Sequence, residues 1–538
     1  DTSICSAGGA GGNSITIRHG GNGVTPFIVG DATTNGTQGA ITSRTDNQIL
    51  PTQSFLGPYN QDDINILTLP PILPPTQSQP AVRLPLSDQN PPLPTSLDSD
   101  PASLFSDTLV EQGEKIFTRE FEAYLGLQET SLKTVSDARN ALRRIEEETG
   151  VKPAIIYAVF VPSNLASETE IGNERSLQSV EQQTERLRVT QRQNSDQLEL
   201  ILVTAEGSPV RKRVSGTNRQ EILRVAGQFR AEITKITSRS NSYLPPAQKM
   251  YQWLLTPLEA DLKVRGIQNL VFIMDERLRS LPLAALHDGQ SFLVENYSVG
   301  LMPSLSLTDT RYTDIKKSHV LAMGASKFTN QKSLPAVSVE LSAITPNLWP
   351  GKALLDEALT LENLKSQRRT ESFGIVHLAT HAIFQPGEPS NSYIQLWDSQ
   401  LRLNQLRQLG WNDPAVQLLV LSACKTAQGS AEVELGFAGL SVQAGVKSAL
   451  ASLWFVSDEG TMALMRKFYE ELRQAPIKAE ALRRAQVAML KGEVRLENGN
   501  LVTPSGVTPL PPELEQLGNQ NLSHPKFWSA FTMIGNPW

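Results

Sequence analysis

Two short stretches decide the fold: VHLATHA at residues 376–382 and LVLSACKTA at residues 419–427. Each is an apolar run of strand length that ends in small and polar residues. Parallel strands of an open α/β sheet leave their carboxyl ends on one edge, where ligands bind. The pattern therefore predicts that His381, at one strand end, faces Cys424, 43 residues later, at another. A thiol beside an imidazole is the arrangement of a nucleophile with its general base.

The pattern around these stretches predicts the fold class. Strands alternate with helices through roughly the last 220 residues, which favours an α/β fold with a mostly parallel sheet covered by helices on both faces. The 43 residues between His381 and Cys424 leave room for the crossover that adjacent parallel strands require.

Several sequence motifs resemble those of the CHAT domain, a branch of the caspase, separase and gingipain superfamily of cysteine peptidases. These motifs are HLATH (377–381), LSACKTA (421–427), the stretch 434–461, DERLRSLPLAALHDG (275–289) and HPKFWSAFTMIGNPW (524–538). The resemblance implies a caspase-like domain at residues 266–538, preceded by a smaller helical and α+β part at 102–265. It also implies a hydrolase that needs no metal or other cofactor.

The first hundred residues have a different composition. Residues 1–50 carry ten glycines in the first 40, which suits turns between the very short strands of a β-solenoid. GGNSITIRHGG (11–21) and GDATTNGTQGAIT (30–42) resemble the last coils of a filamentous-haemagglutinin-like passenger; a glycine-rich tail without regular structure is the alternative. Residues 51–101 contain 12 prolines and are predicted to form a semi-rigid linker.

Composition excludes several classes of protein. A formal net charge of −6 and a pI near 5.7 give no reason to expect a nucleic-acid partner. No apolar run reaches the ~20 residues that span a bilayer. Two cysteines, Cys5 and Cys424, are too few for a disulfide framework. The cellular location stays open. The protein is expected to be secreted or at the cell surface if the N-terminal segment is a haemagglutinin-like passenger, and cytoplasmic otherwise. Without an initiator methionine, the chain is expected to be a piece of a longer protein.

The dyad residues each have a structural alternative. Most free cysteines are buried small hydrophobes, and a histidine at a strand end can simply satisfy a backbone carbonyl. The motif LSACKTA resembles the nucleophile motif of the family and favours the catalytic role for Cys424, with His381 as acid and base. His377 lies four residues before His381, about 13 Å along a strand. That distance is too long for the two histidines to share a metal ion, so His377 is predicted to be either a core residue or a residue that supports the catalytic side chains.

The resemblance also suggests the remaining site residues. Backbone N–H groups of Cys424 and Ala382 are expected to form the oxyanion hole. Position 382 is normally glycine in the family, and alanine adopts a positive φ reluctantly. Asp458 is a candidate to receive a Lys or Arg side chain of the substrate, with a helix N-cap as its alternative role. Glu432 and Glu434, which follow the cysteine, are similar candidates.

Two hypotheses of function follow. The first is a cysteine endopeptidase of CHAT type that hydrolyses a protein or peptide through an acyl-enzyme. Its activity would depend on an activating partner if the small and polar stretch 427–433 gates the site. The second is a non-catalytic pseudo-peptidase that serves as a protein-binding or adhesin module, which the Ala382 departure and the haemagglutinin-like leader favour.

Overall fold

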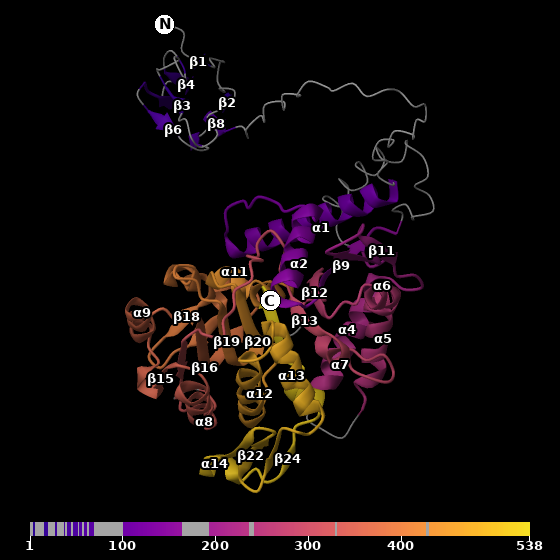
Figure 1. The fold of residues 1–538 in the computed structure, drawn as a ribbon, viewed down its shortest axis with the longest axis vertical. Helices are drawn as coiled ribbons and strands as arrows, with labels where there is room; N and C mark the ends of the chain where they lie inside the picture. The colour runs from indigo at the N-terminus through magenta and orange to yellow at the C-terminus, as the bar shows by residue number, and fades with distance from the viewer. Residues whose placement is uncertain are drawn as a thin grey trace, which may run out of the picture. The chain divides into compact units, whose positions relative to one another are not determined.

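The computed structural model of the 538-residue chain describes residues 101–163, 193–235, 241–328, 331–426 and 430–538, and parts of 4–68. The chain divides into two compact units, Asp1–Thr95 and Ser96–Trp538 (Figure 1). Each unit is considered by itself.

Short strands make up the described part of the N-terminal unit: β1 (Ile4–Cys5), β2 (Ile15–His19), β3 (Phe27–Ile28), β4 (Ile41–Arg44), β5 (Asn47–Ile49), β6 (Ser54–Phe55), β7 (Tyr59–Gln61) and β8 (Ile64–Thr68). β8 pairs in parallel with β2, and β6 pairs with β3. Strands β6 to β8 therefore belong to this unit, although the linker was predicted to begin at residue 51. The rest of that predicted linker, residues 69–100, lies outside the described residues.

A 13-stranded sheet forms the centre of the C-terminal unit. Its order is β11 (Val210–Arg213), β10 (Gln197–Thr204), β9 (Pro153–Val161), β12 (Asn269–Met274), β13 (Ser298–Leu301), β25 (Phe531–Gly535), β20 (Ser448–Ser452), β19 (Leu418–Thr426), β16 (Ile375–Phe384), β14 (Val320–Gly324) and β15 (Gly351–Leu355). The hairpin β17 (Tyr393–Gln395) and β18 (Gln400–Arg402) is attached to the end of β16.

The sheet has two mostly parallel halves whose parallel strands run in opposite directions, with β10, β11 and the β17–β18 hairpin added by antiparallel pairing. β9, β12, β13 and β25 are parallel to one another, as are β20, β19, β16, β14 and β15. The halves meet where β25 pairs antiparallel with β20. The predicted α/β fold with a mostly parallel sheet flanked by helices is thus confirmed. The part predicted as a separate α+β region, 102–265, contributes β9 to β11 to this same sheet.

Burial on both faces explains why these strands are continuously apolar. Alternate residues of β9 belong to two different cores: Ile156 packs with the residues of one core and Ile155 with those of the other. The second core includes Leu142 of a neighbouring helix, α2 (Val135–Thr149), while Phe229 of α4 (Arg219–Thr234) lies in the first. Strands covered on both faces lose the alternation seen in half-exposed sheets.

The longer helices surround this sheet (Figure 1): α1 (Pro101–Leu125), α5 (Leu244–Leu254), α6 (Glu259–Val264), α8 (Val337–Ser342), α9 (Leu361–Thr370), α10 (Ala431–Ala438), α11 (Leu440–Ala444), α12 (Asp458–Leu472) and α13 (Lys478–Leu490). Local signals set their ends, as in α2, where Thr134 forms a capping box and Gly150 adopts a φ of 71°. No helix in the described ranges is long and apolar enough to cross a membrane.

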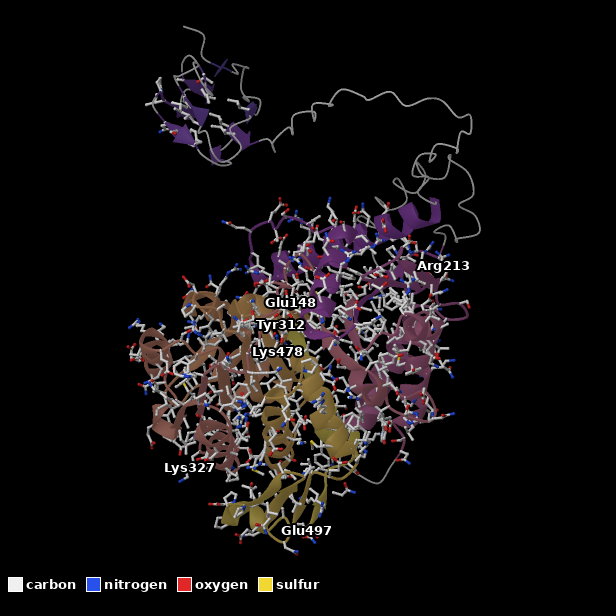
Figure 2. The ribbon with its side chains drawn as sticks, in the orientation of Figure 1. Glu148, Arg213, Tyr312, Lys327, Lys478 and Glu497 are labelled. Atoms are coloured by element: carbon white, nitrogen blue, oxygen red, sulfur yellow. The ribbon has the colours of Figure 1, made fainter. Side chains whose placement is uncertain are left out.

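A small antiparallel sheet follows α13 and is made of β21 (Arg495–Glu497), β22 (Asn500–Thr503), β23 (Gly506–Pro509) and β24 (Gln520–Asn521). Leu496 and Leu501 of this sheet are buried in the main core, whereas Val507 is exposed. In Figure 2, Glu497 marks this sheet, below the ends of α12 and α13 in the view of Figure 1.

Candidate functional site

The two stretches that open the sequence analysis form neighbouring strands. β16 and β19 are parallel, and their backbone register pairs His381 with Ala423 and Ala382 with Cys424. The sequence analysis put the strand ends at His381 and Cys424. In the structure, β16 continues three residues further, to Phe384, and β19 continues two residues further, to Thr426. His381 and Cys424 therefore lie on adjacent strands but one position out of register, and the alternation of a regular strand assigns positions 381 and 424 to opposite faces of the sheet.

A bulge interrupts the pairing of these two strands just before the site. Leu378 is opposite Leu421, whereas His381, three residues later, is opposite Ala423, only two residues later. β16 thus holds one extra residue between the two pairs. Bulges change the register and the direction of side chains locally, and they are frequent beside active sites.

One hydrogen bond and two aromatic rings fix the position of the His381 side chain. Its side chain is 9% exposed, and its Nε2 atom lies 2.8 Å from the carbonyl oxygen of Lys332. The Phe328 ring is 4.8 Å from the imidazole, and the Phe455 ring stacks on it at 6.4 Å. Phe328 and Lys332 come from the segment between β14 and α8, and Phe455 follows β20. Two separate segments of the chain therefore fix this ring.

The Lys332 contact sets the protonation of the imidazole. A carbonyl oxygen can only accept a hydrogen bond, so the Nε2 atom of His381 must carry the proton. Burial lowers the pKa of His381, against the raising effect of the Lys332 carbonyl. The neutral ring is then favoured near pH 7, with its Nδ1 atom free to accept a proton.

Ala382 lies between two paired strands. It is opposite Cys424 of β19 on one side and opposite Ile394 of β17 on the other. It is not among the described residues that have a positive φ. Alanine is therefore sterically acceptable at this position, where the family pattern has glycine.

Asp458 is the first residue of α12, and its carboxylate lies mostly in the interior. Its Oδ2 atom accepts a hydrogen bond from the backbone N–H of Ala336, just before α8. The predicted alternative, the N-cap role, falls to Ser457, whose hydroxyl accepts from the N–H of Gly460 at 3.4 Å. Burial raises the pKa of Asp458 to about 7, and the nearby Lys332 lowers it only in part.

The two glutamates after the cysteine lie in α10 and differ in exposure. Glu432 is exposed and bonds the hydroxyl of Ser430. Glu434 is 4% exposed and accepts hydrogen bonds from the Arg277 backbone and the Ser280 hydroxyl. Burial raises the pKa of Glu434. Its carboxylate is thus engaged inside the protein, while residues 427–429 of the predicted gating stretch lie outside the described residues.

His377 lies in the core, which is one of the two roles expected for it. It is fully buried, with Nδ1 3.1 Å from the Tyr469 hydroxyl of α12 and Nε2 2.9 Å from a carboxylate oxygen of Glu340 in α8. Within the described ranges, no group of three or more His, Cys, Asp or Glu side chains is arranged to hold a metal ion.

Sequence reasoning missed the residues that fix the imidazole: Phe328, Lys332 and Phe455. Lys332 acts through its carbonyl oxygen, which every residue type possesses, so no signal could have identified it. Phe455 lies three residues after the end of β20 at Ser452, and its ring stacks on the imidazole. An aromatic residue directly after a strand end was the available signal.

Comparisons with known proteins give a family and several similar folds. A comparison with curated protein sequences gives no match. The Saccharomyces cerevisiae separase–securin complex is similar with a TM-score of 0.42 and 10% identity over 82% of this chain and 34% of that chain. The chain thus spans about a third of the separase chain. The complex of the Porphyromonas gingivalis RgpB pro- and mature domains has a TM-score of 0.32 and 11% identity over 59% of this chain and 75% of that chain. For the Arg-specific cysteine proteinase gingipain R (RGPB) the values are 0.32 and 10%, over 59% of this chain and 73% of that chain.

The family comparison covers more than half of the sequence. The model of the CHAT domain matches residues 244–536, a range that includes β12 to β25 and both strands of the site. The chain belongs to the CHAT domain family.

Proposed function

We propose that the protein is a cysteine endopeptidase in which Cys424 is the nucleophile and His381 the general base and acid. The backbone register of β16 and β19 carries the proposal, because it brings the two positions onto adjacent strands at the carboxyl edge of one half of the sheet. Neighbouring strands are about 4.8 Å apart, so the two backbone positions lie close together, and the dyad requires position 424 to depart from the regular alternation of side chains at the end of β19.

The chemistry follows from the state of the imidazole. Neutral His381 accepts the thiol proton at Nδ1 as the sulfur attacks the scissile carbonyl carbon. The imidazolium then returns this proton to the amine nitrogen, which leaves as the C–N bond breaks and an acyl-enzyme remains. Water, deprotonated by His381, attacks the thioester and releases the acid and the thiol.

Backbone N–H groups of Cys424 and Ala382 are proposed to bind the oxyanion of the tetrahedral intermediate. Their side-by-side register supports this assignment. Both residues lie in paired strands, so an N–H that takes part in the ladder has to be released from its strand partner to bind the oxyanion.

Asp458 remains the best-supported candidate to receive a basic substrate side chain. Its pKa of about 7 means that burial outweighs the hydrogen bond from Ala336 and the charge of Lys332. A Lys or Arg side chain placed beside it would restore the ionised form. Glu434 is already bonded internally, and Glu432 is exposed. A protein that activates the enzyme through residues 427–433 remains part of the proposal.

Thiol reactivity tests the dyad without knowledge of the substrate. The experiment uses the Cys5→Ser background, so that Cys424 is the only thiol, and measures the rate of iodoacetamide alkylation from pH 5 to 9 by mass spectrometry. We expect rapid labelling at neutral pH that falls at least tenfold in His381→Ala. His377→Gln is the matched control, because it removes a buried histidine that is outside the dyad.

Substrate cleavage is then compared between wild type and Cys424→Ala on a proteome-derived peptide library. Cleavage that is lost in Cys424→Ala supports the peptidase. A thiol that titrates near 8.5, is indifferent to His381→Ala and is accompanied by no cleavage would show that the domain is a non-catalytic binding module.

A further inference from the structure

Exposed aromatic side chains lie beside His381 and in the lining of a nearby cavity. Of the Trp and Phe side chains that the structure describes, two are exposed: Trp397 at 38% and Phe455 at 37%. Phe455 stacks on the His381 ring. Trp397 lines a cavity of about 900 Å³ whose wall includes Phe328, the other ring in contact with the imidazole. Large exposed aromatic residues close to a site mark surfaces that bind a partner.

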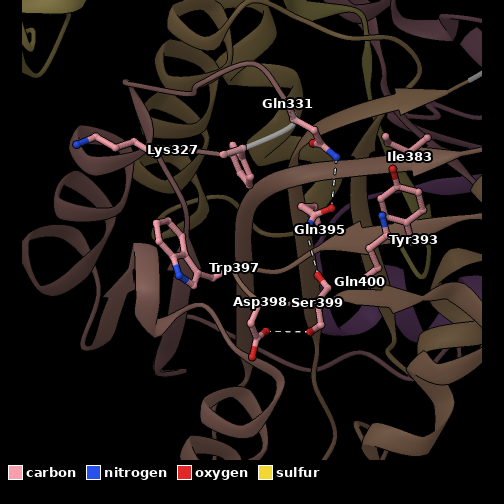
Figure 3. Close-up of a pocket in the computed structure, with 10 residues that line it drawn as sticks. Lys327, Gln331, Ile383, Tyr393, Gln395, Trp397, Asp398, Ser399 and Gln400 are labelled. Carbon is pink, nitrogen blue, oxygen red and sulfur yellow. Dashed lines mark hydrogen bonds between the residues drawn. The ribbon is translucent and has the colours of Figure 1, made fainter.

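This cavity lies between the β17–β18 hairpin and the segment that follows β14 (Figure 3). Ile383, two residues after His381, forms part of its lining, so the cavity adjoins the candidate catalytic residue. Rings of Phe328, Tyr393 and Trp397 form its aromatic walls.

The polar lining of the cavity is mostly uncharged. Gln331 donates to the side chain of Gln395 at 3.3 Å, and Gln395 in turn donates to the Ser399 carbonyl at 3.1 Å. Gln395 also donates to the Leu396 carbonyl at 2.7 Å, so its own amide is fully engaged. The buried side-chain oxygen of Gln331 has no hydrogen-bond partner in the described part of the chain and can accept from a backbone N–H of an extended peptide. Lining charges are balanced, with one cation, Lys327, and one anion, Asp398.

Both charged side chains of the lining are exposed to solvent. Lys327 is exposed and points away from the other labelled side chains in Figure 3, and Figure 2 places it at the periphery of the C-terminal unit. Asp398 is exposed and accepts a hydrogen bond from Ser399 at 2.9 Å. The three rings offer stacking surface to an aromatic or long aliphatic side chain, and no buried charge in the described lining would hold an ion in place.

We propose that this cavity is a specificity pocket for a large uncharged side chain, aromatic or long aliphatic, that flanks the scissile bond of a polypeptide substrate. The inference rests on the proposed peptidase function. It concerns a subsite separate from Asp458, so a basic residue at one substrate position and an apolar residue at another are compatible. Trp397 is then a specificity-determining residue that contacts substrate and takes no part in the chemistry.

Cleavage-site profiling tests the pocket. Wild type digests a proteome-derived peptide library, and mass spectrometry counts residues at the three positions on each side of every cut. We expect enrichment of Phe, Tyr, Trp, Leu or Met at one fixed position. For a peptide with such a residue, Trp397→Ala raises KM roughly three- to tenfold with kcat unchanged, and Trp397→Phe retains most of the affinity. Val507→Ala, an exposed apolar residue on β23, is the control and leaves KM unchanged.

A binding measurement separates failure of the pocket from failure of the peptidase. Peptides retained by immobilised Cys424→Ala protein are compared with those retained by the Cys424→Ala, Trp397→Ala double variant. Loss of the apolar peptides in the double variant supports the pocket even if wild type cleaves nothing. Two results would overturn it: a fixed position enriched in Lys, Arg, Asp or Glu that depends on Trp397, or peptide retention that is indifferent to Trp397.

Discussion

His381 is the residue whose surroundings decide how the dyad would work. Its Nε2 atom is committed to the Lys332 carbonyl, and burial lowers its pKa below the usual 6.5. A buried neutral imidazole removes the proton during attack, whereas a preformed thiolate–imidazolium pair requires a raised pKa.

We therefore expect the acid limb of kcat/KM to lie below pH 6.5. Protonation of His381 abolishes the base, and burial delays that protonation to lower pH. Asp458 titrates near pH 7 and would produce its own limb, so the profile is measured in parallel on Asp458→Asn with a substrate that lacks a basic residue. A limb above pH 6.5 that persists in Asp458→Asn contradicts the neutral-base mechanism.

Asp458 also predicts a pH dependence of stability. Its pKa rises from 3.8 to about 7 on folding, so the folded state holds the proton more tightly. The associated stability is fully present below pH 3.8 and is lost as the pH rises through 7. Relative to Asp458→Asn, the wild-type free energy of unfolding should fall between pH 4.5 and pH 8. We expect a fall on the order of 2 kcal/mol, about half the full effect of the shift, because the carboxylate keeps some contact with solvent.

Urea unfolding followed by tryptophan fluorescence measures this difference. All seven tryptophans lie between residues 253 and 538, so the signal reports only the C-terminal unit. Parallel curves for the two proteins across this pH range would contradict the buried state of Asp458.

At the scale of elements, apolar runs identified β16 and β19 because a doubly covered strand needs a continuous apolar sequence. Their ends and the bulge between Leu378 and His381 were not predictable, since both depend on pairing with another strand. The position of Cys424 was predicted relative to His381, but the register that pairs it with Ala382 was not. Contacts between distant segments, such as Lys332 with His381, leave no local pattern.

Helix α12 is tied to β16 through a buried hydrogen bond. Tyr469→Phe removes the hydroxyl that lies 3.1 Å from the Nδ1 atom of His377 and leaves a buried imidazole nitrogen without this partner. We expect a loss of about 1–2 kcal/mol in the free energy of unfolding. Tyr124→Phe is the matched control, because the buried Tyr124 hydroxyl has no hydrogen-bond partner in the described part of the chain. Equal effects of the two substitutions would contradict the role of the His377 contact.

At the scale of the whole C-terminal unit, β25 joins the two halves of the sheet. This strand pairs in parallel with β13 of one half and antiparallel with β20 of the other. The backbone hydrogen bonds that join the halves therefore involve residues 531–535, near the end of the chain. The candidate site belongs to one half, while α2 packs on β9 and β10 of the other. Folding of the site strands should therefore be coupled to the docking of residues 531–535.

Gly535, the last residue of β25, provides a test of this coupling. It has a φ of 84°, and a Cβ atom there would lie 2.7 Å from the Lys447 carbonyl oxygen. Gly492 is the control, because its φ is 70° and a Cβ atom would meet nothing within 4 Å. We expect Gly492→Ala to cost about 1–2 kcal/mol for its left-handed backbone. Gly535→Ala should cost a further 1–3 kcal/mol, roughly, because the neighbouring backbone cannot move aside.

The two variants are compared by urea unfolding with tryptophan fluorescence, and by hydrogen exchange of β19 and β12. If β25 couples the halves, Gly535→Ala accelerates exchange in both strands, whereas Gly492→Ala alters neither selectively. Acceleration confined to β19 and β20 would mean that the half containing the site folds independently. The candidate dyad would then be stabilised without the rest of the sheet.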